Sequence, residues 1–524
     1  MSDNVTAESS CSPKLVAAID VGANSVRMVI AQVLPGAEIE VLERLQQPVR
    51  LGQDTFRQGR LGAHSMRAAV AILRDYRRML DLYQVERIRA VATSAVREAS
   101  NADTFLDRVL MATGLNVEVI ATSEESRLTV SAVLEALEAA SKAGFDVNHQ
   151  ETLIVDVGGG STLLSVLQRG EIANSLSLRL GSIRLQEVFA TSEESPERSA
   201  ELLRHHIANA IASIKGALPL RNIRAFVAVG GDARFAAREV GKPTACSDLY
   251  VVPRAEFNKL VRRCERHTTE ELARRHALPF AEAETLNPAL LVYQGLLHHT
   301  RAKEMIVSQV SMRDGLLREL ARRLTGSQDQ TLAESVIHSA TALAARYRVS
   351  MKHAKIVAEL AVRLFDELQS EHGLGPRYRL LLRVAGLLHE VGRFVSSQAH
   401  HKHSYYLINN SELFGLNRGD INLLAHVARY HRRSGPKPSH IDYMSLPRES
   451  RVIVSKLAAL LRVADAMARG QIKRKEGLLF QRRGDELIIL VPGKDDLILE
   501  QRALAAKGDL FEEIYGMKVR LEHL

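Results

Sequence analysis

The sequence predicts an α/β protein whose C-terminal part is largely helical. Short β-branched runs alternate with helical stretches up to about residue 327, which is the pattern of α/β architecture. From residue 328 onward, apolar residues recur at three- and four-residue spacing in successive segments, which predicts an all-helical domain. After residue 475 the runs become strand-like again, which indicates a small C-terminal α/β domain.

The expected elements can be placed by their apolar pattern. The expected strands of the first part are Val16–Asp20, Arg27–Gln32, Ile88–Thr93, Val117–Ala121, Thr152–Val157 and Ala225–Val229, with helices over Met66–Leu82 and Pro196–Ala217. The expected helices of the second part are Leu332–Arg348, Lys352–Gln369, Arg377–His389, Asp420–His431 and Arg451–Ala468. The last strand-like runs are Leu487–Val491, Leu497–Glu500 and Lys518–Leu521.

One strand–turn–strand unit occurs twice. Asp20-Val21-Gly22-Ala23-Asn24-Ser25 is repeated as Asp156-Val157-Gly158-Gly159-Gly160-Ser161, each after an apolar strand and before another strand-like run. A duplicated unit implies two similar domains that face each other. We therefore divide the chain into a disordered N-terminus (1–13), two similar domains (14–135 and 136–327), a helical domain (328–475) and a C-terminal domain (476–524).

Composition excludes several protein classes. The 524 residues are 46% hydrophobic and 25% charged, which is typical of a globular protein and excludes a largely disordered chain. Three cysteines, Cys11, Cys246 and Cys264, indicate neither a disulfide framework nor a zinc ribbon. The polar N-terminus is unlike a signal peptide, and no apolar run approaches a membrane span, so we expect a cytoplasmic protein.

The net charge of +9 is concentrated in one region. Residues 377–475 contain 18 Lys and Arg residues and six acidic residues, a balance of +12, which leaves −3 for the remaining chain. A local positive field favours a polyanion such as nucleic acid, anionic lipid or polyphosphate. A solvated basic surface that keeps the protein soluble explains the charge equally well at this point.

The repeated turns predict phosphate and metal binding. A carboxylate at a strand end, Asp20 or Asp156, can hold Mg²⁺, and glycines let backbone N–H groups approach phosphate oxygens. The turns also supply the polar groups that we assign to phosphate: Asn24, Ser25, Arg27, Gly158, Gly159, Gly160, Ser161 and Thr162. One such turn alone is more often an ordinary hairpin. Gly230-Gly231 forms a third glycine turn, which fits a phosphate site or a tight strand–helix connection.

These motifs together resemble the exopolyphosphatase/guanosine pentaphosphate phosphohydrolase (Ppx/GppA) family. The resemblance runs from about Lys14 to Leu524. It is carried by the segments Ala18–Arg27, Ala92–Asn101, Val119–Leu128, the Asp156 loop, Leu180–Leu185 and Met312–Leu316, in that order. It implies two actin-like, ribonuclease H-like domains followed by an all-α HD-like domain and a small α/β domain.

The resemblance also implies roles for residues. Glu125 is expected to be the general base that deprotonates a water, while Thr93 and Arg97 bind phosphate and Asp20 and Asp156 hold Mg²⁺. A monovalent cation is a second candidate ion. Without the resemblance, Glu124 and Glu125 would be read as an acidic pair that stabilises a helix N-terminus.

Three positions depart from the family pattern. Ala23 replaces a Ser or Thr, Asp232 replaces a commoner Thr, and Leu163 replaces a glutamate thought to help at the metal. Leucine neither binds Mg²⁺ nor acts as a base. The metal would then have fewer protein ligands, or the activity would be reduced.

The helical region is rich in histidine. Nine of the 19 histidines lie between His353 and His440. The order His353, His389-Glu390, His426/His431 and Asp465 resembles an HD phosphohydrolase, in which these groups would chelate a divalent metal. The alternative is a vestigial HD site at His353, His389, Glu390 and Asp465. We expect a polyanion track formed by His401, Lys402, His403, Arg429, His431, Arg432 and Arg433.

We therefore expect an Mg²⁺-dependent exopolyphosphatase that works as a homodimer on inorganic polyphosphate, with neither nucleic acid nor a membrane as partner. One alternative is a guanosine pentaphosphate (pppGpp) 5′-phosphohydrolase. A second is a catalytically weak regulator that binds polyphosphate or an alarmone, which Leu163 motivates. A third is a metal-dependent HD hydrolase.

Overall fold

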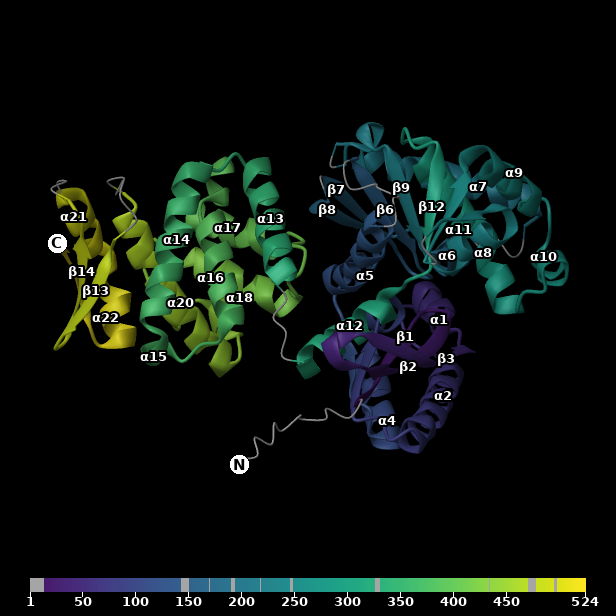
Figure 1. Ribbon diagram of the computed structural model, residues 1–524, viewed down its shortest axis with the longest axis horizontal. Helices are drawn as coiled ribbons and strands as arrows, with labels where there is room; N and C mark the ends of the chain where they lie inside the picture. The colour runs from purple at the N-terminus through teal and green to yellow at the C-terminus, as the bar shows by residue number, and fades with distance from the viewer. Residues whose placement is uncertain are drawn as a thin grey trace, which may run out of the picture. The chain divides into compact units, whose positions relative to one another are not determined.

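The computed structural model describes residues 14–142, 150–168, 170–189, 194–216, 218–245, 248–325, 330–432, 434–469, 477–493 and 497–524 (Figure 1). The chain divides into two compact units between residues 329 and 330. The first unit contains two β-sheets, and the second is mainly helical. The expected N-terminal segment 1–13 and the expected boundaries near residues 327 and 475 lie outside the described residues.

The first sheet has apolar side chains on both faces. Its strand order is β3-β2-β1-β4-β5, with β1 antiparallel to β2 and parallel to β4. Ala17 and Ile19 pack on one side with α2 (Ala63–Leu82), whereas Val16 and Ala18 pack on the other with α12 (Met312–Thr325). The strands are β1 (Lys14–Val21), β2 (Ser25–Val33), β3 (Ile39–Pro48), β4 (Arg87–Ala92) and β5 (Val117–Val119).

The second sheet repeats this arrangement. Its order is β10-β11-β12-β9-β6-β7-β8, in which β8-β7-β6-β9-β12 corresponds to β3-β2-β1-β4-β5. Both copies have a register irregularity between the second and third strands, at Ile30/Ala31 and at Val166/Leu167. The strands are β6 (Thr152–Val157), β7 (Thr162–Gln168), β8 (Glu171–Leu178), β9 (Ala225–Val229), β10 (Lys242–Pro243), β11 (Leu249–Pro253) and β12 (Glu304–Ser308). The duplication predicted from the sequence is therefore confirmed.

Helices cover the sheets and connect them. α5 (Thr122–Lys142) leads from the first sheet to the second, and α12 (Met312–Thr325) returns from the second sheet to pack on the first and on α5 (Figure 1). The expected boundary at 135/136 falls inside α5. The other helices are α1 (Leu51–Gln58), α2 (Ala63–Leu82), α3 (Ser94–Arg97), α4 (Ala102–Thr113), α6 (Ser182–Phe189), α7 (Pro196–Ile214), α8 (Gly231–Val240), α9 (Arg254–Cys264), α10 (Thr269–His276) and α11 (Phe280–His298).

The second unit is a helical bundle with a small sheet. Its expected helices are confirmed to within a few residues. They are α13 (Gln330–Arg346), α14 (Met351–Glu367), α16 (Pro376–Leu388), α18 (Arg418–Arg429) and α20 (Arg448–Met467). The sequence did not predict α15 (Gln369–His372), α17 (His400–Asn409) and α19 (Ile441–Met444).

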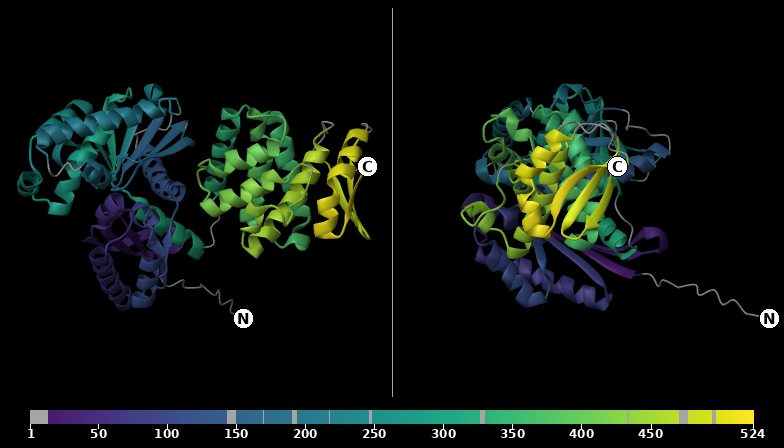
Figure 2. Two further views of the ribbon diagram at one scale, coloured as in Figure 1. Left: turned by 180° about the vertical axis from the view of Figure 1, so that it is seen from behind. Right: turned by 90° about the vertical axis from the view of Figure 1, so that its left-hand side faces the viewer.

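The C-terminal sheet shares the core of the bundle. Its order is β13-β14-β15, formed by Leu479–Arg483, Glu486–Val491 and Lys518–His523, together with α21 (Ile498–Lys507) and α22 (Asp509–Tyr515) (Figure 2). Ile489 and Phe511 belong to the same apolar cluster as the bundle helices. The strand expected at Leu497–Glu500 is wrong, because this segment begins a helix whose apolar side buries Ala503 and Leu504. None of the described helices has the length and apolarity of a membrane span.

Candidate active site

The two repeated turns have the same geometry and line one cleft. The Gly22 N–H donates to the Ser25 carbonyl at 3.0 Å, and the Gly158 N–H donates to the Ser161 carbonyl at 2.9 Å. Each turn follows a strand that ends near a carboxylate, Asp20 or Asp156. The cleft brings together Asp20, Asn24, Ser25, Arg27, Thr93, Glu125, Asp156, Gly158, Gly159, Gly160, Ser161, Gly230 and Gly231. These residues were all assigned to the site from the sequence.

Four arginines supply the positive charges of the cleft, whose lining also contains five carboxylates. Arg27, Arg234, Arg238 and Arg313 line it. Burial, together with the nearby positive charge of Arg27, lowers the pKa of Arg313 to about 10. The Nε of Arg27 and an Nη of Arg234 are buried without a hydrogen-bond partner. Because unpaired buried donors are costly, these arginines are suited to an anion that accepts their bonds.

Two carboxylates fit a hard divalent cation. Asp20 is 8% exposed, and one of its oxygens is buried without a partner. Burial raises the pKa of both Asp20 and Asp156, although Arg27 and Arg313 oppose this at Asp20 and Thr129 opposes it at Asp156. Mg²⁺ takes one or two carboxylates and completes its shell with water and substrate phosphates. The donor set and the unpartnered oxygen therefore fit Mg²⁺.

Glu125 lies in the first turn of α5 and lines the cleft. Burial raises its pKa to about 7; Arg97 opposes the shift, whereas Asp156 and Asp20 add to it. An Nη of Arg97 lies 3.3 Å from a Glu125 oxygen, and the same group donates to the Ile120 carbonyl at 2.7 Å. A carboxylate with this pKa near neutral pH can accept a proton from water.

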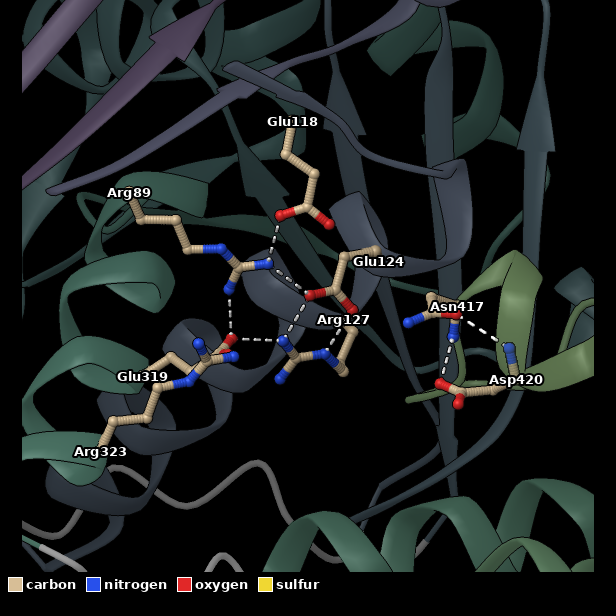
Figure 3. Close-up of polar contacts among 8 residues, drawn as sticks. All are labelled: Arg89, Glu118, Glu124, Arg127, Glu319, Arg323, Asn417 and Asp420. Atoms are coloured by element: carbon tan, nitrogen blue, oxygen red, sulfur yellow. Dashed lines mark hydrogen bonds and ion pairs between the residues drawn. The ribbon is translucent and has the colours of Figure 1, made fainter. Parts of the chain in front are cut away.

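An ion-pair network fixes the start of α5 (Figure 3). Glu124, next to Glu125, accepts two hydrogen bonds from Arg127 at 2.7 Å and one from Arg89 at 3.2 Å. Glu319 of α12 accepts from both arginines at 2.6 Å. Glu124 is thus turned into the network, which leaves the neighbouring Glu125 to face the cleft. The alternative expected from the sequence was that both glutamates only stabilise the N-terminus of the helix. This description fits Glu124 better than Glu125.

Two of the glycines are required, one by close packing and the other by its backbone conformation. A Cβ at Gly160 would lie 2.2 Å from the Ser94 hydroxyl oxygen, so no larger residue fits there. Gly230 has φ +119°, a conformation that L-residues rarely adopt, and it caps α8 directly after β9. The third glycine turn is therefore a tight strand–helix connection whose residues also line the cleft.

Two expected phosphate-binding residues do not line the cleft. Thr162 is fully buried, and its hydroxyl donates to the Leu180 carbonyl at 2.7 Å, so this side chain supports the turn and does not reach a ligand. Arg97 contacts Glu125 and is absent from the cleft lining. Leu163 is 5% exposed and pairs in register with Asp156, so it adds an apolar side chain next to the carboxylate.

The sequence did not assign several residues that shape the cleft. Arg234 and Arg313 both lie inside motifs recognised in the sequence. Arg234 comes shortly after a glycine turn at the end of a strand, and this position could have identified it as a cleft residue. Burial, together with the nearby negative charge of Glu282, raises the pKa of Asp232 to about 7. The Tyr293 hydroxyl donates to the Val229 carbonyl and accepts from the Val157 N–H at 3.3 Å, joining two of the turns. No local signal marks Tyr293, because its partners are distant in sequence.

The expected polyanion track lies in the helical unit. Lys402 is exposed, and His403 and Arg432 are partly exposed. Arg429 donates to Asp442 at 3.1 Å and stacks over the Tyr405 ring at 5.2 Å. Burial lowers the pKa of His401 to about 4, so it adds no positive charge at neutral pH. Arg433 lies outside the described residues.

The expected HD-like residues come together inside the bundle. Ligand atoms of His353, His389 and Glu390 lie within 4.8 Å of one another. Asp465 Oδ1 lies 3.6 Å from His353 Nε2 and 3.8 Å from His389 Nε2. His431 is 2% exposed and also lies in this group, so it cannot contact a chain bound on the surface as the polyanion track requires.

Each of the two units matches the model of a known protein family or domain. Residues 29–324 match the model of the Ppx/GppA phosphatase family, and residues 337–508 match the model of Ppx/GppA phosphatase domain III. Together these matches cover most of the described chain.

Individual proteins and solved structures are similar to this chain over part or most of its length. A guanosine-5′-triphosphate,3′-diphosphate pyrophosphatase of Photobacterium profundum is 24% identical over 449 residues, which are 86% of this chain and 85% of the relative. The crystal structure of an exopolyphosphatase from Cytophaga hutchinsonii matches 60% of this chain and 99% of its own with TM-score 0.53 at 22% identity. An Aquifex aeolicus Ppx/GppA protein matches 60% of this chain and 100% of its own with TM-score 0.48 at 25% identity. The Cytophaga structure supports the actin-like fold that the resemblance implied.

Proposed function

The chain belongs to the Ppx/GppA phosphatase family, and on this premise we propose that it is an exopolyphosphatase. It hydrolyses the terminal phosphoanhydride bond of inorganic polyphosphate and releases orthophosphate. The observation that carries the proposal is Glu125, whose pKa of about 7 makes it a base at neutral pH, in a cleft lined by four arginines.

Each group of cleft residues has its own role in the proposed hydrolysis. Glu125 accepts the proton of a water whose oxygen attacks the terminal phosphorus, and the bond from that phosphorus to the bridging oxygen breaks. The N–H groups of the glycine turns and the arginines hold the phosphate oxygens and compensate their charge. Asp20 and Asp156 would hold Mg²⁺, which when bound supplies further charge neutralisation. Arg97 orients Glu125 through its contact at 3.3 Å.

The cleft lining favours a phosphate chain. The described residues that line it are mainly glycines, polar side chains, carboxylates and arginines, and their single aromatic ring is that of Phe235, itself 3% exposed. A nucleoside site is usually lined by apolar and aromatic side chains around the base. A linear polyanion needs only the charge and the donors.

The second candidate is a pppGpp 5′-phosphohydrolase. It is favoured by the Photobacterium relative, which carries the name of that activity. The reaction is the same phosphoanhydride hydrolysis, so the two candidates differ in the part of the substrate beyond the cleaved bond. Comparing kcat/KM for long polyphosphate and for pppGpp with one preparation decides between them.

Glu125→Gln tests the mechanism. The variant keeps the size of the side chain and removes the base, so phosphate release from long polyphosphate should fall about 10²- to 10⁴-fold. Glu138→Gln on the same helix is the matched control, because Glu138 is exposed (65%), and it should keep the wild-type rate. A full rate in Glu125→Gln would overturn the mechanism, and so would a rate that survives removal of divalent ions with EDTA.

The same assay addresses the weak regulator. If the wild type binds polyphosphate tightly with negligible turnover, and Leu163→Glu restores turnover, the regulatory function is supported and the enzymatic one is wrong.

We further propose that the protein acts in the cytoplasm as a homodimer on this soluble polyanion, with neither nucleic acid nor membrane involved. Analytical ultracentrifugation tests the dimer.

A further inference from the structure

The beginning of α6 binds the carbonyl oxygens of the second glycine turn. The Ser182 N–H donates to the Gly158 carbonyl at 3.0 Å. The N–H groups of Ile183 and Arg184 both donate to the Gly159 carbonyl, at 3.0 and 3.1 Å. Two consecutive carbonyls of the turn are thereby directed toward α6.

A side chain binds the next carbonyl of the turn. Arg184 Nε donates to the Gly160 carbonyl at 2.7 Å. Gly181, directly before α6, permits this close approach, because a Cβ there would lie 2.2 Å from the Gly160 carbonyl carbon. The three carbonyls of residues 158–160 therefore all face α6.

The planar peptide bond determines which groups these contacts leave free. In a trans peptide the C=O of one residue and the N–H of the next point in opposite directions. The N–H groups of Gly159, Gly160 and Ser161 are therefore turned away from α6. Within the described chain none of these three N–H groups has a hydrogen-bond acceptor, and all three residues line the cleft. Adjacent free N–H groups of this kind form a concave site for an anion.

Arg184 is itself held by the part of the protein that contains the first sheet. Its guanidinium group lies 4.0 Å above the centre of the Phe56 ring of α1, and Nη2 donates to Glu98, directly after α3, at 2.5 Å. The Arg184 side chain is only 8% exposed. Glu98 also follows Arg97, which contacts Glu125. Two neighbouring residues thus contact the proposed base and the arginine that binds the turn.

The first turn is bound by backbone groups at the corresponding place. The Gly52 N–H of α1 donates to the Ala23 carbonyl at 2.9 Å, and the Val49 N–H donates to the Asn24 carbonyl at 2.9 Å. No substitution of a side chain removes either bond. In the second turn, by contrast, the bond to the last glycine carbonyl depends on a side chain that a substitution can remove.

We propose that Arg184 is a positioning residue for phosphate binding, which fixes the second glycine turn with its three free N–H groups facing the cleft. This role rests on the proposed function, because the anion held there is the phosphate chain of the substrate. Arg184 does not belong to the described lining of the cleft, so it acts through the turn. Without Arg184 the peptide unit between Gly160 and Ser161 is free to rotate and to turn its N–H away from the phosphate.

Binding of inorganic tripolyphosphate to the full-length protein tests this role. The parent is Glu125→Gln, which should bind the chain without hydrolysing it, and isothermal titration calorimetry with Mg²⁺ gives the Kd and the stoichiometry separately. In Arg184→Gln the Kd should rise about tenfold or more, the loss expected for one hydrogen bond to a charged phosphate. A purely structural defect would lower the fraction of protein that binds, and hence the stoichiometry, with the Kd unchanged.

Arg179→Gln is the matched control. It removes an arginine that contacts the same carboxylate, Glu98, at 2.9 Å, but the Arg179 side chain is 79% exposed and donates to no carbonyl of the described turn. Its Kd should remain within about twofold of the parent value.

Arg184→Lys separates orientation from charge. The lysine keeps the positive charge but lacks the planar fork of the guanidinium group. One ammonium group cannot bind Gly160 and Glu98 while a flat cation covers the Phe56 ring. The Kd should therefore rise about threefold or more.

Three results would overturn the role of Arg184 alone. A parent Kd in Arg184→Gln shows that the backbone bonds of α6 are sufficient to hold the turn. A parent Kd in Arg184→Lys shows that the positive charge matters and its orientation does not. A loss in Arg179→Gln equal to that in Arg184→Gln shows a general effect of charge.

Two further outcomes keep the test decisive. A parent that binds no tripolyphosphate overturns the proposed function together with this role, which distinguishes the two failures. If Arg184→Gln does not fold, Glu98→Ala provides the readout, because the Glu98 side chain is 33% exposed and its loss frees the same guanidinium group. Its Kd should then rise about threefold or more, and an unchanged Kd would contradict the role.

Discussion

Removing the charge of Glu319 should destabilise the sheet-containing unit by about 3 kcal/mol. Burial would raise the pKa of this carboxylate, but Arg127 and Arg89 outweigh burial and lower it to about 2. Against the ordinary glutamate pKa of about 4.3, at about 1.4 kcal/mol per pKa unit, this gives about 3 kcal/mol. The side chain is 20% exposed, so little of this is lost to solvent screening.

An independent argument gives the same size. Glu319→Gln leaves the guanidinium groups of Arg89 and Arg127, whose side chains are 13% and 8% exposed, with less compensation. Breaking a buried ion pair by removing one partner costs about 3–5 kcal/mol. Arg323 is 67% exposed and should contribute little, so a double-mutant cycle should show strong coupling of Glu319 to Arg127 and weak coupling to Arg323.

The pH dependence has a definite sign. Because the folded pKa lies below the unfolded one, the stabilisation is complete above about pH 5 and is lost as the pH falls toward 2. Hydrogen exchange measured peptide by peptide during urea titration gives the opening free energy of α5 and α12 separately from the helical unit. Glu138→Gln, which removes an exposed pair on α5, should change it by less than about 0.5 kcal/mol. A change below about 1 kcal/mol in Glu319→Gln, or one that does not shrink in acid, would refute this reasoning.

Three further predictions concern the cleft. The kcat/KM should fall as the pH drops through about 7, where Glu125 becomes protonated, and in Arg97→Gln this limb should move up by about one pH unit; a downward shift contradicts the assigned contact. Gly160→Ala places a methyl 2.2 Å from a serine hydroxyl and should cost about 1–3 kcal/mol by thermal unfolding, whereas Gly216→Ala, with open space around it, should cost less than 1 kcal/mol. Thr162→Val should lose about 1–3 kcal/mol of stability with an unchanged KM, since its hydroxyl is bonded to a backbone carbonyl; a raised KM would return it to the phosphate-binding group.

Local patterns predicted the parts of the fold that local forces determine. The repeat around Asp20 and Asp156 predicted two similar halves, because the same turn requires the same glycine positions and strand directions. The helices of the bundle followed from the spacing of their apolar residues. The strand expected at Leu497–Glu500 failed because a short apolar run fits a strand or a helix equally well until tertiary packing decides.

Residues of the site were predicted only where they belong to a recognisable sequence motif. Glu125 and the glycine turns were expected from their segments, and the structure brings them into one cleft. Thr162 belongs to the same motif, yet it begins β7, in which residues 162–167 are all buried, and its hydroxyl bonds the distant Leu180 carbonyl, which composition cannot reveal. Tyr293 joins turns that lie 64 and 136 residues away, so no window of sequence contains its role. His431 was assigned to a surface track because its neighbours in the sequence are cationic. Its burial results from the packing of the bundle helices, which the local sequence does not reveal.

The return of α12 to the first sheet determines how this chain can be divided. Leu316 and Leu317 follow the last strand of the second sheet, but they cover Val16 and Ala18 of the first strand of the protein. A fragment that stops before residue 312 would leave one face of β1 open to water, and a fragment that starts after residue 135 would carry the helix without its partner. We therefore expect neither half to be obtained alone as a soluble product, although co-expression of the two pieces should restore the pair. The two similar halves are therefore expected to fold as one unit.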